Sequence, residues 1–458
     1  MTTTPTAAPI AAATTAPPAA PAASSSDLID LLAGITPGSA LAGLRERRAQ
    51  AREHAQLSFN ALLEPEHPGT FTLAERYAVA LFVAQLHGFA EAEEFYADVL
   101  GDEAPALVSL LSGPDGVAAA AIAAGPRGAY REPGLFAEST AAAQWQPDAA
   151  DAAAVGERLA AALAHAHLLV TRPREATPAA LRSLAGAGWS ADDIVSLSQL
   201  VSFLAFQLRT AWGLRAIAGQ FPGRPAPLAG GAGGGGSTTA IGSAPAQRPR
   251  PTNPAPVTDY PELRRPEHFT QQGLGWVPWL EPVAKADLTA EQLDALIEPT
   301  RANMPYFRLL ARDPAALKAR TLTDLDIFFN VTDGVGRAER ELAATAASRH
   351  NGCVFCASVH SAAATRESGR TGDVQRLLDD GVGADLGDAT WNAIVSASVS
   401  LTNTPLSFGG DDVARLREAG LDDAEVLDIV NGAAFFNWAN RLMLSLGEPE
   451  VPAGRVRA

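Results

Sequence analysis

The stretch REAGLDDAEVLDIVNGAAFFNWANRLMLSL, residues 417–446, decides the fold because a related stretch occurs earlier in the chain. That counterpart, AGAGWSADDIVSLSQLVSFLAFQLRTAWGL, occupies residues 185–214. Each copy has a glycine, then Ser or Asp with an acidic cluster, and then an apolar stripe with aromatic residues that reaches an arginine at the same offset. Ser190 and Asp422 therefore predict the N-caps of two equivalent long helices.

A second pair of similar segments lies earlier in each half: FTLAERYAVALFVAQLHGF at residues 71–89 and RAERELAATAASRHNGCVF at residues 337–355. Aligned end to end, these segments set Glu75 opposite Glu341. A shift of two residues would instead match the AER triplets and set Glu75 opposite Glu339. The two pairs predict an internal duplication with a period far longer than a solenoid repeat, and hence two homologous domains. Chance similarity between Ala-rich helices is the alternative.

Helical periodicity dominates both halves. Segments such as DPAALKARTLTDLDIFFNV and ATWNAIVSASVSLT carry apolar residues at spacings of three and four, and Gly-Val-Gly, Asn-Gly and Thr-Pro breaks separate them. No run of alternating residues predicts a strand. The expected fold class is all-α, with each of the two homologous domains a compact helical bundle.

Two low-complexity segments set the domain boundaries. Residues 1–26 hold only Ala, Thr, Pro, Ser and one Ile after the initiator Met, which predicts a disordered tail. The run RPAPLAGGAGGGGSTTAIGSAPAQRPRPTNPAP, residues 224–256, predicts a flexible linker, which we place at residues 224–262. The expected domains are residues 27–223, which lack cysteine, and residues 263–458, which hold both cysteines.

Composition excludes several classes of partner. A formal charge of −16 argues against a nucleic-acid partner, because a phosphate backbone would be repelled. No stretch of about eighteen apolar residues free of charge and proline predicts a membrane span, and the N-terminus lacks the basic start of a secretory signal. Two cysteines in 458 residues do not make a secreted disulfide framework. We expect a cytoplasmic protein without nucleic-acid or membrane partners.

Both cysteines lie in one short segment, ASRHNGCVFCASVHSAAATRESG, residues 347–369. A helix is expected to end at its Asn-Gly pair and a new one to start near Cys353, where free N–H groups and the helix dipole stabilise a thiolate. His360, four residues after Cys356, shares a helix face with it and can exchange a proton with the thiol. Glu341 could orient that imidazole from the preceding helix. Such a set can reduce a peroxide, because a thiolate attacks the O–O bond and a second thiol resolves the sulfenic acid.

A zinc site and a structural disulfide are the alternatives for the cysteine pair. His350, Cys353, Cys356 and His360 are acceptable zinc ligands, but structural zinc normally takes its ligands from two separated segments. A structural disulfide across so short a loop would stabilise little. Haem attachment is excluded because Ala357, not His, follows the second cysteine.

The pattern Glu-x11-Cys-x2-Cys-x3-His on an all-α domain resembles the alkyl hydroperoxidase D / carboxymuconolactone decarboxylase superfamily. The similarity is closest to its peroxidase-related branch, through Arg340-Glu341 and through SRHNGCVFCASVH at residues 348–360. It is strong over about residues 288–447 and extends more weakly, through the duplication, over residues 39–217. The chain departs from the best-studied members at Val354-Phe355, because those members carry a histidine between the cysteines.

This resemblance implies roles for four residues. Cys356 would be the peroxidatic cysteine, Cys353 the resolving thiol and proton donor, and His360 and Glu341 the proton relay. The implied function is a thiol-dependent peroxidase for hydrogen or organic hydroperoxides, without cofactor or metal, with an unidentified dithiol as reductant and with assembly as a homo-oligomer. The alternative is a non-catalytic binding or scaffold protein, or a decarboxylase-type relative, whose cysteine pair is incidental or binds zinc.

The first half lacks this chemistry. In the register that pairs Glu75 with Glu341, His87, Ala90 and Glu94 stand where the second half has its two cysteines and its histidine. No cysteine occurs anywhere in the first half. We expect the N-terminal domain to be a redox-inactive copy that packs as a pseudo-symmetric partner.

Overall fold

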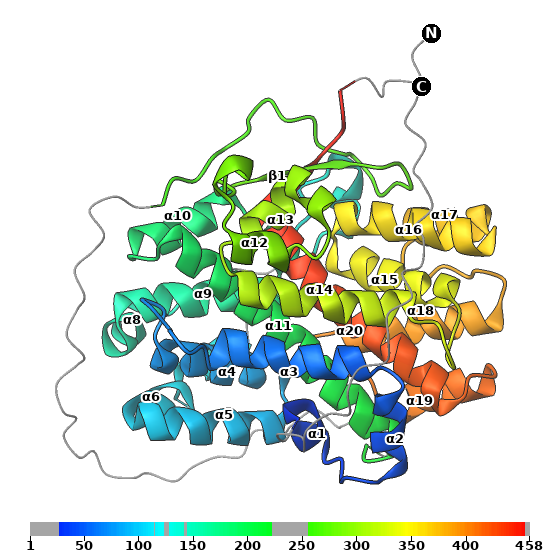
Figure 1. Ribbon diagram of the computed structural model, residues 1–458, viewed down its shortest axis with the longest axis horizontal. Coiled ribbons are helices and arrows are strands. Elements are labelled where there is room, and N and C mark those ends of the chain that lie inside the picture. Colours follow the sequence, from blue (N-terminus) through cyan, green and yellow to red (C-terminus); the bar gives the residue numbers. More distant parts are fainter. Residues whose placement is uncertain (1–26, 114, 123–127, 142–143, 222–254, 454–458) are drawn as a thin grey trace.

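The computed structural model describes residues 27–113, 115–122, 128–141, 144–221 and 255–453. The predicted tail, and the predicted linker as far as residue 254, lie outside the described residues. In the part that is described, α-helices dominate and one short two-stranded sheet is present (Figure 1). The predicted all-α fold class is confirmed.

The first half of the chain is built from short and medium helices that end in one long helix. In chain order these are α1 (Leu28–Ala33), α2 (Ala40–Glu46), α3 (Ala49–Leu63), α4 (Leu73–His87), α5 (Ala90–Glu103), α6 (Pro105–Leu111), α7 (Val117–Ile122), the 3₁₀ turn η1 (Pro133–Glu138), α8 (Ala149–Val155), α9 (Glu157–Thr171), η2 (Pro173–Glu175), α10 (Pro178–Gly186) and α11 (Ala191–Ile217).

The second half likewise ends in a long helix, followed by a strand. Its elements are β1 (Gly275–Pro278), η3 (Lys285–Asp287), α12 (Ala290–Ala295), η4 (Pro299–Asn303), α13 (Pro305–Leu310), α14 (Pro314–Phe329), α15 (Arg337–Asn351), α16 (Val354–Ser368), α17 (Thr371–Asp379), α18 (Ala389–Thr402), α19 (Gly410–Glu418), α20 (Asp423–Leu446) and β2 (Gly447–Glu450). β1 and β2 pair antiparallel, with Gly275 opposite Glu450. These two short strands were not predicted from the sequence.

Helices of similar length follow one another in the same order in the two halves. α3, α4 and α5 correspond to α14, α15 and α16, and α9, α10 and α11 correspond to α18, α19 and α20. The two predicted N-caps are confirmed, because the Ser190 and Asp422 side chains accept hydrogen bonds from N–H groups in the first turns of α11 and α20. This order is the one that two related domains would produce.

The helix boundaries correct the register between the halves. α4 and α15 follow N-caps at Thr72 and Gly336, so that Glu75 lies opposite Glu339 and not opposite Glu341. Glu75 closes a capping box with Thr72, and this local role explains why a glutamate stands there. The end-to-end alignment is therefore wrong by two residues, because the start of the helix and not the apolar pattern fixes equivalent positions.

In the corrected register, other residues of the first half stand opposite the cysteines and the histidine. Phe89, Ala92 and Tyr96 take these places, all of them buried. The residues expected from the first alignment, His87, Ala90 and Glu94, do not. The conclusion that the first half lacks the thiol chemistry is unchanged.

The two long helices α11 and α20 pack on each other in the middle of the molecule (Figure 1). Phe206 of α11 stacks on Trp438 of α20 with ring centroids 5.5 Å apart. Two edge contacts flank the stack, Phe203 with Trp438 at 5.2 Å and Phe206 with Phe435 at 6.1 Å. Counted from the N-caps, Phe203 corresponds to Phe435 and Phe206 corresponds to Trp438. The two edge contacts are therefore equivalent, and the aromatic cluster joins the halves symmetrically.

α11 is also the one helix in the described residues that is long and apolar enough to cross a membrane. Of its most apolar window, 94% is buried inside the molecule. This burial is typical of a core helix that other helices surround.

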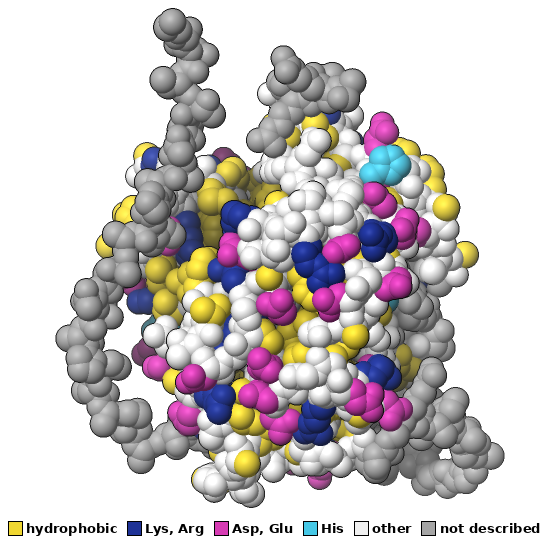
Figure 2. All heavy atoms as spheres, turned by 90° about the vertical axis from the view of Figure 1, so that its right-hand side faces the viewer, with side chains coloured by type: hydrophobic (Ala, Val, Ile, Leu, Met, Phe, Trp, Pro, Cys, Tyr) yellow, Lys and Arg dark blue, Asp and Glu magenta, His cyan; other side chains and the backbone are white. Residues whose placement is uncertain are grey.

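Charged side chains of both signs are scattered over the surface on the right of Figure 1, among polar and hydrophobic atoms. Figure 2 shows this face, on which acidic and basic side chains are interspersed. On this face the acidic side chains, which outnumber the basic ones in the sequence, lie next to basic side chains. Neighbouring side chains of opposite charge can therefore form ion pairs.

A buried ion-pair network ties the two halves together at one edge of the core. Asp428 of α20 accepts hydrogen bonds from Arg48, which precedes α3, at 2.9 and 2.8 Å. It also accepts from Arg340 of α15 at 2.6 Å. All three side chains are buried. Two guanidinium groups therefore depend on one carboxylate for neutralisation away from water.

Replacing that carboxylate tests the network. Asp428→Asn leaves Arg48 and Arg340 buried beside a neutral amide, so we expect the free energy of unfolding to fall by about 3–5 kcal/mol. Urea unfolding followed by circular dichroism measures this loss. The control is Asp423→Asn at the start of the same helix, where both partners of the pair with Arg417 are 46% exposed and the loss should stay at or below about 1 kcal/mol. Equal losses in the two variants would contradict the role of the network.

Candidate active site

The two cysteines stand at the start of α16. α15 ends at Asn351, and Gly352 has φ 82°, a left-handed conformation that favours glycine. This turn makes Cys353 the N-cap of α16 and puts Cys356 in its first turn, as the sequence predicts. Both cysteines are buried, and their side chains lie 3.1 Å apart without a disulfide.

Glu341 and His360 meet beside the cysteines. His360 Nδ1 of α16 lies 2.5 Å from Glu341 Oε2 of α15. The other oxygen of Glu341 accepts a hydrogen bond from Arg337 Nε, one turn earlier in α15. Glu341 is completely buried, whereas 19% of the His360 side chain is exposed. The structure thus brings the four predicted site residues together, and His360 connects them to the surface.

The contact between Glu341 and His360 sets the charge of both groups. Burial would raise the pKa of Glu341, but His360 and Arg337 outweigh burial and hold the pKa of this carboxyl below its usual value. Burial would lower the pKa of His360, but Glu341 and Cys356 outweigh it and raise the pKa of the imidazole. The site therefore favours a carboxylate that faces an imidazolium.

The two thiols differ in acidity. Burial raises the pKa of Cys353 well above its usual value, and a hydrogen bond to the Cys356 sulfur raises it further. Burial would also raise the pKa of Cys356, but the hydrogen bond from Cys353 and the charge of His360 outweigh burial and lower it. Cys356 is therefore the group that ionises first, and Cys353 is the thiol that stabilises it.

Asn440 and Arg320, from two other helices, complete the site, and neither was predicted from the sequence. Asn440 of α20 donates a hydrogen bond that helps to lower the pKa of Cys356, after the larger effects of burial, Cys353 and His360. Arg320 of α14 adds a positive charge near the same sulfur. These residues lie far from the cysteines in the sequence, so no motif spacing could have found them.

Three of the side chains around the site hold buried donors without a partner in the part of the chain that the structure describes. They are Tyr306 Oη, Arg320 Nε and Trp438 Nε1. The Arg320 guanidinium lies over the rings of Phe435 at 5.0 Å, Tyr306 at 5.9 Å and Trp438 at 6.0 Å. Burial raises the pKa of Tyr306 to about 12, so its hydroxyl keeps its proton. Electrostatic interactions with Cys356 place Tyr306 and Arg320 near its sulfur, and Trp438 joins the same cluster through Arg320.

His350 lies outside this cluster. Its Nε2 is 3.0 Å from Asn403 Oδ1, in the loop after α18. Within the described ranges, no three His, Cys, Asp or Glu side chains come close enough together to hold a metal ion. The four-ligand set that the sequence analysis considered for zinc is therefore not assembled.

Comparison with known families supports the resemblance seen in the sequence. Residues 314–397 match the carboxymuconolactone decarboxylase family. The match runs from the start of α14 into α18 and so includes all four predicted site residues. The chain matches no curated protein and no solved structure. The family support applies to this segment, which is well under half of the chain.

The pH dependence of alkylation tests the charge arrangement. We expect iodoacetamide to modify Cys356 before Cys353, with a midpoint below the usual pKa of a thiol, because the Cys356 thiolate forms first. Glu341→Gln lowers the pKa of His360, removes the cation beside Cys356, and should shift the midpoint to higher pH. Mass spectrometry of the two sites measures both rates.

The matched control for this experiment is Glu367→Gln on α16, which removes a carboxylate that pairs with Arg366 at the surface. Its alkylation midpoint should equal that of the wild type. An unchanged alkylation midpoint in Glu341→Gln would contradict the inferred effect of Glu341 on His360 and Cys356.

Proposed function

We propose that this protein is a thiol-dependent peroxidase that reduces hydrogen peroxide or organic hydroperoxides. The observation that carries the proposal is the cluster in which Cys353 lies 3.1 Å from Cys356 and His360, on the same helix, pairs with Glu341 at 2.5 Å. This arrangement lowers the pKa of Cys356. Reduction of an O–O bond by thiols requires a thiolate, a proton donor for the leaving oxygen and a second thiol. The matched family also contains decarboxylases, and the cysteine pair beside the His360–Glu341 pair is what favours the peroxidase over a decarboxylase-type relative.

In the first step, the Cys356 thiolate attacks one oxygen of the hydroperoxide. An S–O bond forms, the O–O bond breaks, and the alkoxide or hydroxide leaves with the electron pair. The His360 imidazolium donates a proton to that leaving oxygen, and Glu341 stabilises the imidazolium until the transfer. Tyr306 and Arg320 supply donors that stabilise the negative charge on the oxygen. The products are a Cys356 sulfenic acid and an alcohol or water.

In the second step, the Cys353 thiol attacks the sulfenic sulfur. The side chains already lie 3.1 Å apart, so the disulfide forms with little movement of the backbone. The Cys353 proton and the sulfenic hydroxyl leave as water. An external dithiol then reduces the disulfide and becomes oxidised itself, which returns both thiols.

We also propose that the two halves are a tandem pair in which only the second half is redox active. The corresponding order of the helices and the symmetric cluster around Phe206 and Trp438 support this proposal. In the first half, Tyr96 takes the position of the histidine and donates its hydroxyl to Gln207 at 2.5 Å. That half then acts as the packing partner that holds α20 in place. A cytoplasmic location and assembly of the chain into homo-oligomers also remain proposals.

Single cysteine substitutions separate the two steps. Cys356→Ser should reduce peroxide consumption, in the presence of dithiothreitol, to that of buffer alone, because the nucleophile is gone. Cys353→Ser should react once with peroxide and keep a sulfenic acid on Cys356, which dimedone labels and mass spectrometry detects. Wild-type rates of peroxide consumption in both variants would refute the proposed function.

Arg320→Met tests the electrostatic contribution of α14. The pKa of Cys356 should rise, and peroxide consumption at neutral pH should fall about tenfold, as for loss of roughly 1.4 kcal/mol of stabilisation. Part of the rate should return at higher pH, where the thiolate forms without the arginine. Arg366→Gln, an exposed arginine on α16, is the control and should leave the rate unchanged. If the pH dependence of peroxide consumption were the same in Arg320→Met as in the wild type, this role of Arg320 would be excluded.

A further inference from the structure

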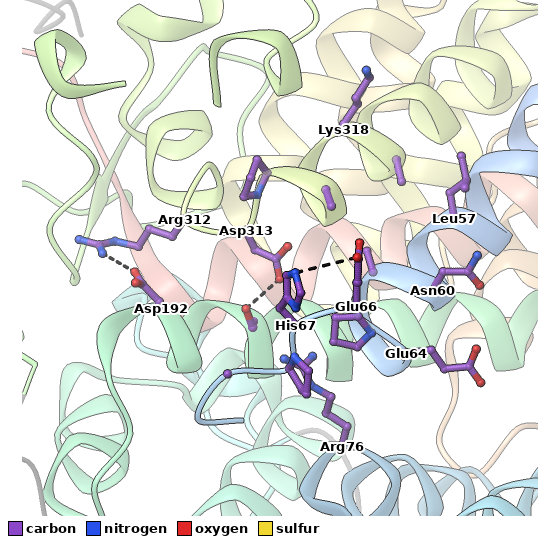
Figure 3. Close-up of a pocket in the computed structure, with 18 of the residues that line it drawn as sticks. Leu57, Asn60, Glu64, Glu66, His67, Arg76, Asp192, Arg312, Asp313 and Lys318 are labelled. Carbon is purple, nitrogen blue, oxygen red and sulfur yellow. Dashed lines mark hydrogen bonds and ion pairs between the residues drawn. The ribbon is translucent and has the colours of Figure 1, made fainter. Parts of the chain in front are cut away.

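A second site lies between the two halves, and none of the residues that line it belongs to the cysteine site. It is a pocket of about 780 Å³, a volume typical of sites for small ligands. Its walls come from the end of α3, the loop at residues 64–70, and the starts of α11 and α14. Figure 3 shows Arg76 and Asp313 pointing into this space from opposite sides.

Arg76 of α4 corresponds to Arg340 of α15, because both stand four residues after the N-cap of their helix. Arg76 Nε donates to the Phe71 carbonyl at 3.0 Å, and Arg340 Nε donates in the same way to the Val335 carbonyl at 3.0 Å. Nη1 of each arginine donates to a carbonyl in α3 or α14 at 2.5 Å. The two arginines are therefore held in the same orientation.

The third nitrogen distinguishes the two arginines. Arg340 Nη2 donates to the Asp428 carboxylate at 2.6 Å. Ser196 stands at the corresponding place in α11, six residues after the N-cap, as Asp428 does in α20. Its short side chain brings no charge, and Arg76 Nη2 has no acceptor in the described residues. Only 5% of Arg76 is exposed, and the carboxylates of Asp313, Asp193 and Glu75 stabilise its charge from a distance without contacting it.

Asp313, the N-cap of α14, stands at the position that corresponds to Arg48, the N-cap of α3. Arg48 precedes α3 and binds Asp428, whereas Asp313 precedes α14 and accepts a hydrogen bond from Ser196 Oγ at 2.8 Å. One edge of the core therefore holds the set Arg340, Asp428 and Arg48. The corresponding set at the other edge is Arg76, Ser196 and Asp313. Asp313 and Arg76 are too far apart to form an ion pair, and the pocket lies between them.

The remaining charged side chains give the pocket an acidic character. Arg312 points away from it in Figure 3 and pairs with Asp192 at 2.6 Å. Lys318 also points away and pairs with Asp294, which does not line the pocket. Asp313 and the acidic groups of the rim oppose a ligand with net negative charge. A cationic group on the ligand would offset this repulsion.

We propose that this pocket binds a small zwitterion, an amino carboxylate, whose carboxylate pairs with Arg76 Nη2 and whose ammonium group faces Asp313. The ligand carboxylate takes the place that Asp428 occupies in the other half. The ammonium group neutralises a carboxylate that otherwise has only Ser196 and the N–H of Ala316 as donors. The proposal does not depend on the chemistry of the cysteines.

A panel of matched ligands tests the proposal by isothermal titration calorimetry on the full chain. The probes are unbranched ω-amino carboxylates of two to six carbons, with the carboxylates and the amines of the same carbon number. At least one amino carboxylate should bind about tenfold more tightly than its matched carboxylate and its matched amine. Absence of binding by every probe, or equal affinity for an amine or a carboxylate of matched length, would overturn the proposal.

Four variants locate the binding. Arg76→Gln should weaken binding of the amino carboxylate about tenfold or more, and Asp313→Asn should remove its advantage over the matched carboxylate. The double variant S196D/D313R copies the network of the other half and should abolish binding while circular dichroism shows a folded protein. Arg182→Gln, an exposed arginine of α10 that does not line the pocket, is the control and should bind as the wild type does. Binding that survives both Arg76→Gln and the double variant would refute the assignment.

Discussion

The packing of α11 against α20 is the contact on which the rest of the molecule depends. The stack of Phe206 on Trp438 buries both helices between the halves, so neither long helix has a solvent-facing side along this stretch. α20 then presents Asn440 and Phe436 to the cysteine site, with the Phe436 ring 4.0 Å from the His360 ring. A rotation of α20 would break the stack of Phe206 on Trp438 and would at the same time move Asn440 away from Cys356. Core packing and site geometry are thus two consequences of one interface.

Burial also explains why the charges of the site are so closely ordered. Arg337, Glu341, His360 and Cys356 form a row in which positive and negative groups alternate. In a buried environment each neighbour shifts the ionisation of the next more than it would in water, because solvent does not screen the pair. The Arg337–Glu341 ion pair therefore influences the ionisation of Cys356 through His360. Arg337 and His360 are 21% and 19% exposed, whereas Glu341 is completely buried, so the row meets solvent only at its two cations.

The sequence predicted the elements that local chemistry determines. The helical period, the N-caps Ser190 and Asp422, and the glycine turn before Cys353 depend on residues close together in the chain, and the structure has all of them. Arg320 and Asn440 could not be predicted, because they reach the thiols only through the packing of α14 and α20. The register of the first pair of segments failed for a related reason. Ala-rich helices match at several offsets, and only the capping residues fix where each helix begins.

The two halves differ in a complementary way at corresponding positions. Where the second half has a partly exposed His360, the first half has Tyr96, buried and bonded to Gln207. Where the second half closes around Asp428, the first half keeps a pocket beside Arg76. Arg76 keeps one donor without an acceptor in the described residues, whereas the corresponding donor of Arg340 binds Asp428. The ligand proposed for this pocket would give the half without thiols a role distinct from its support of α20.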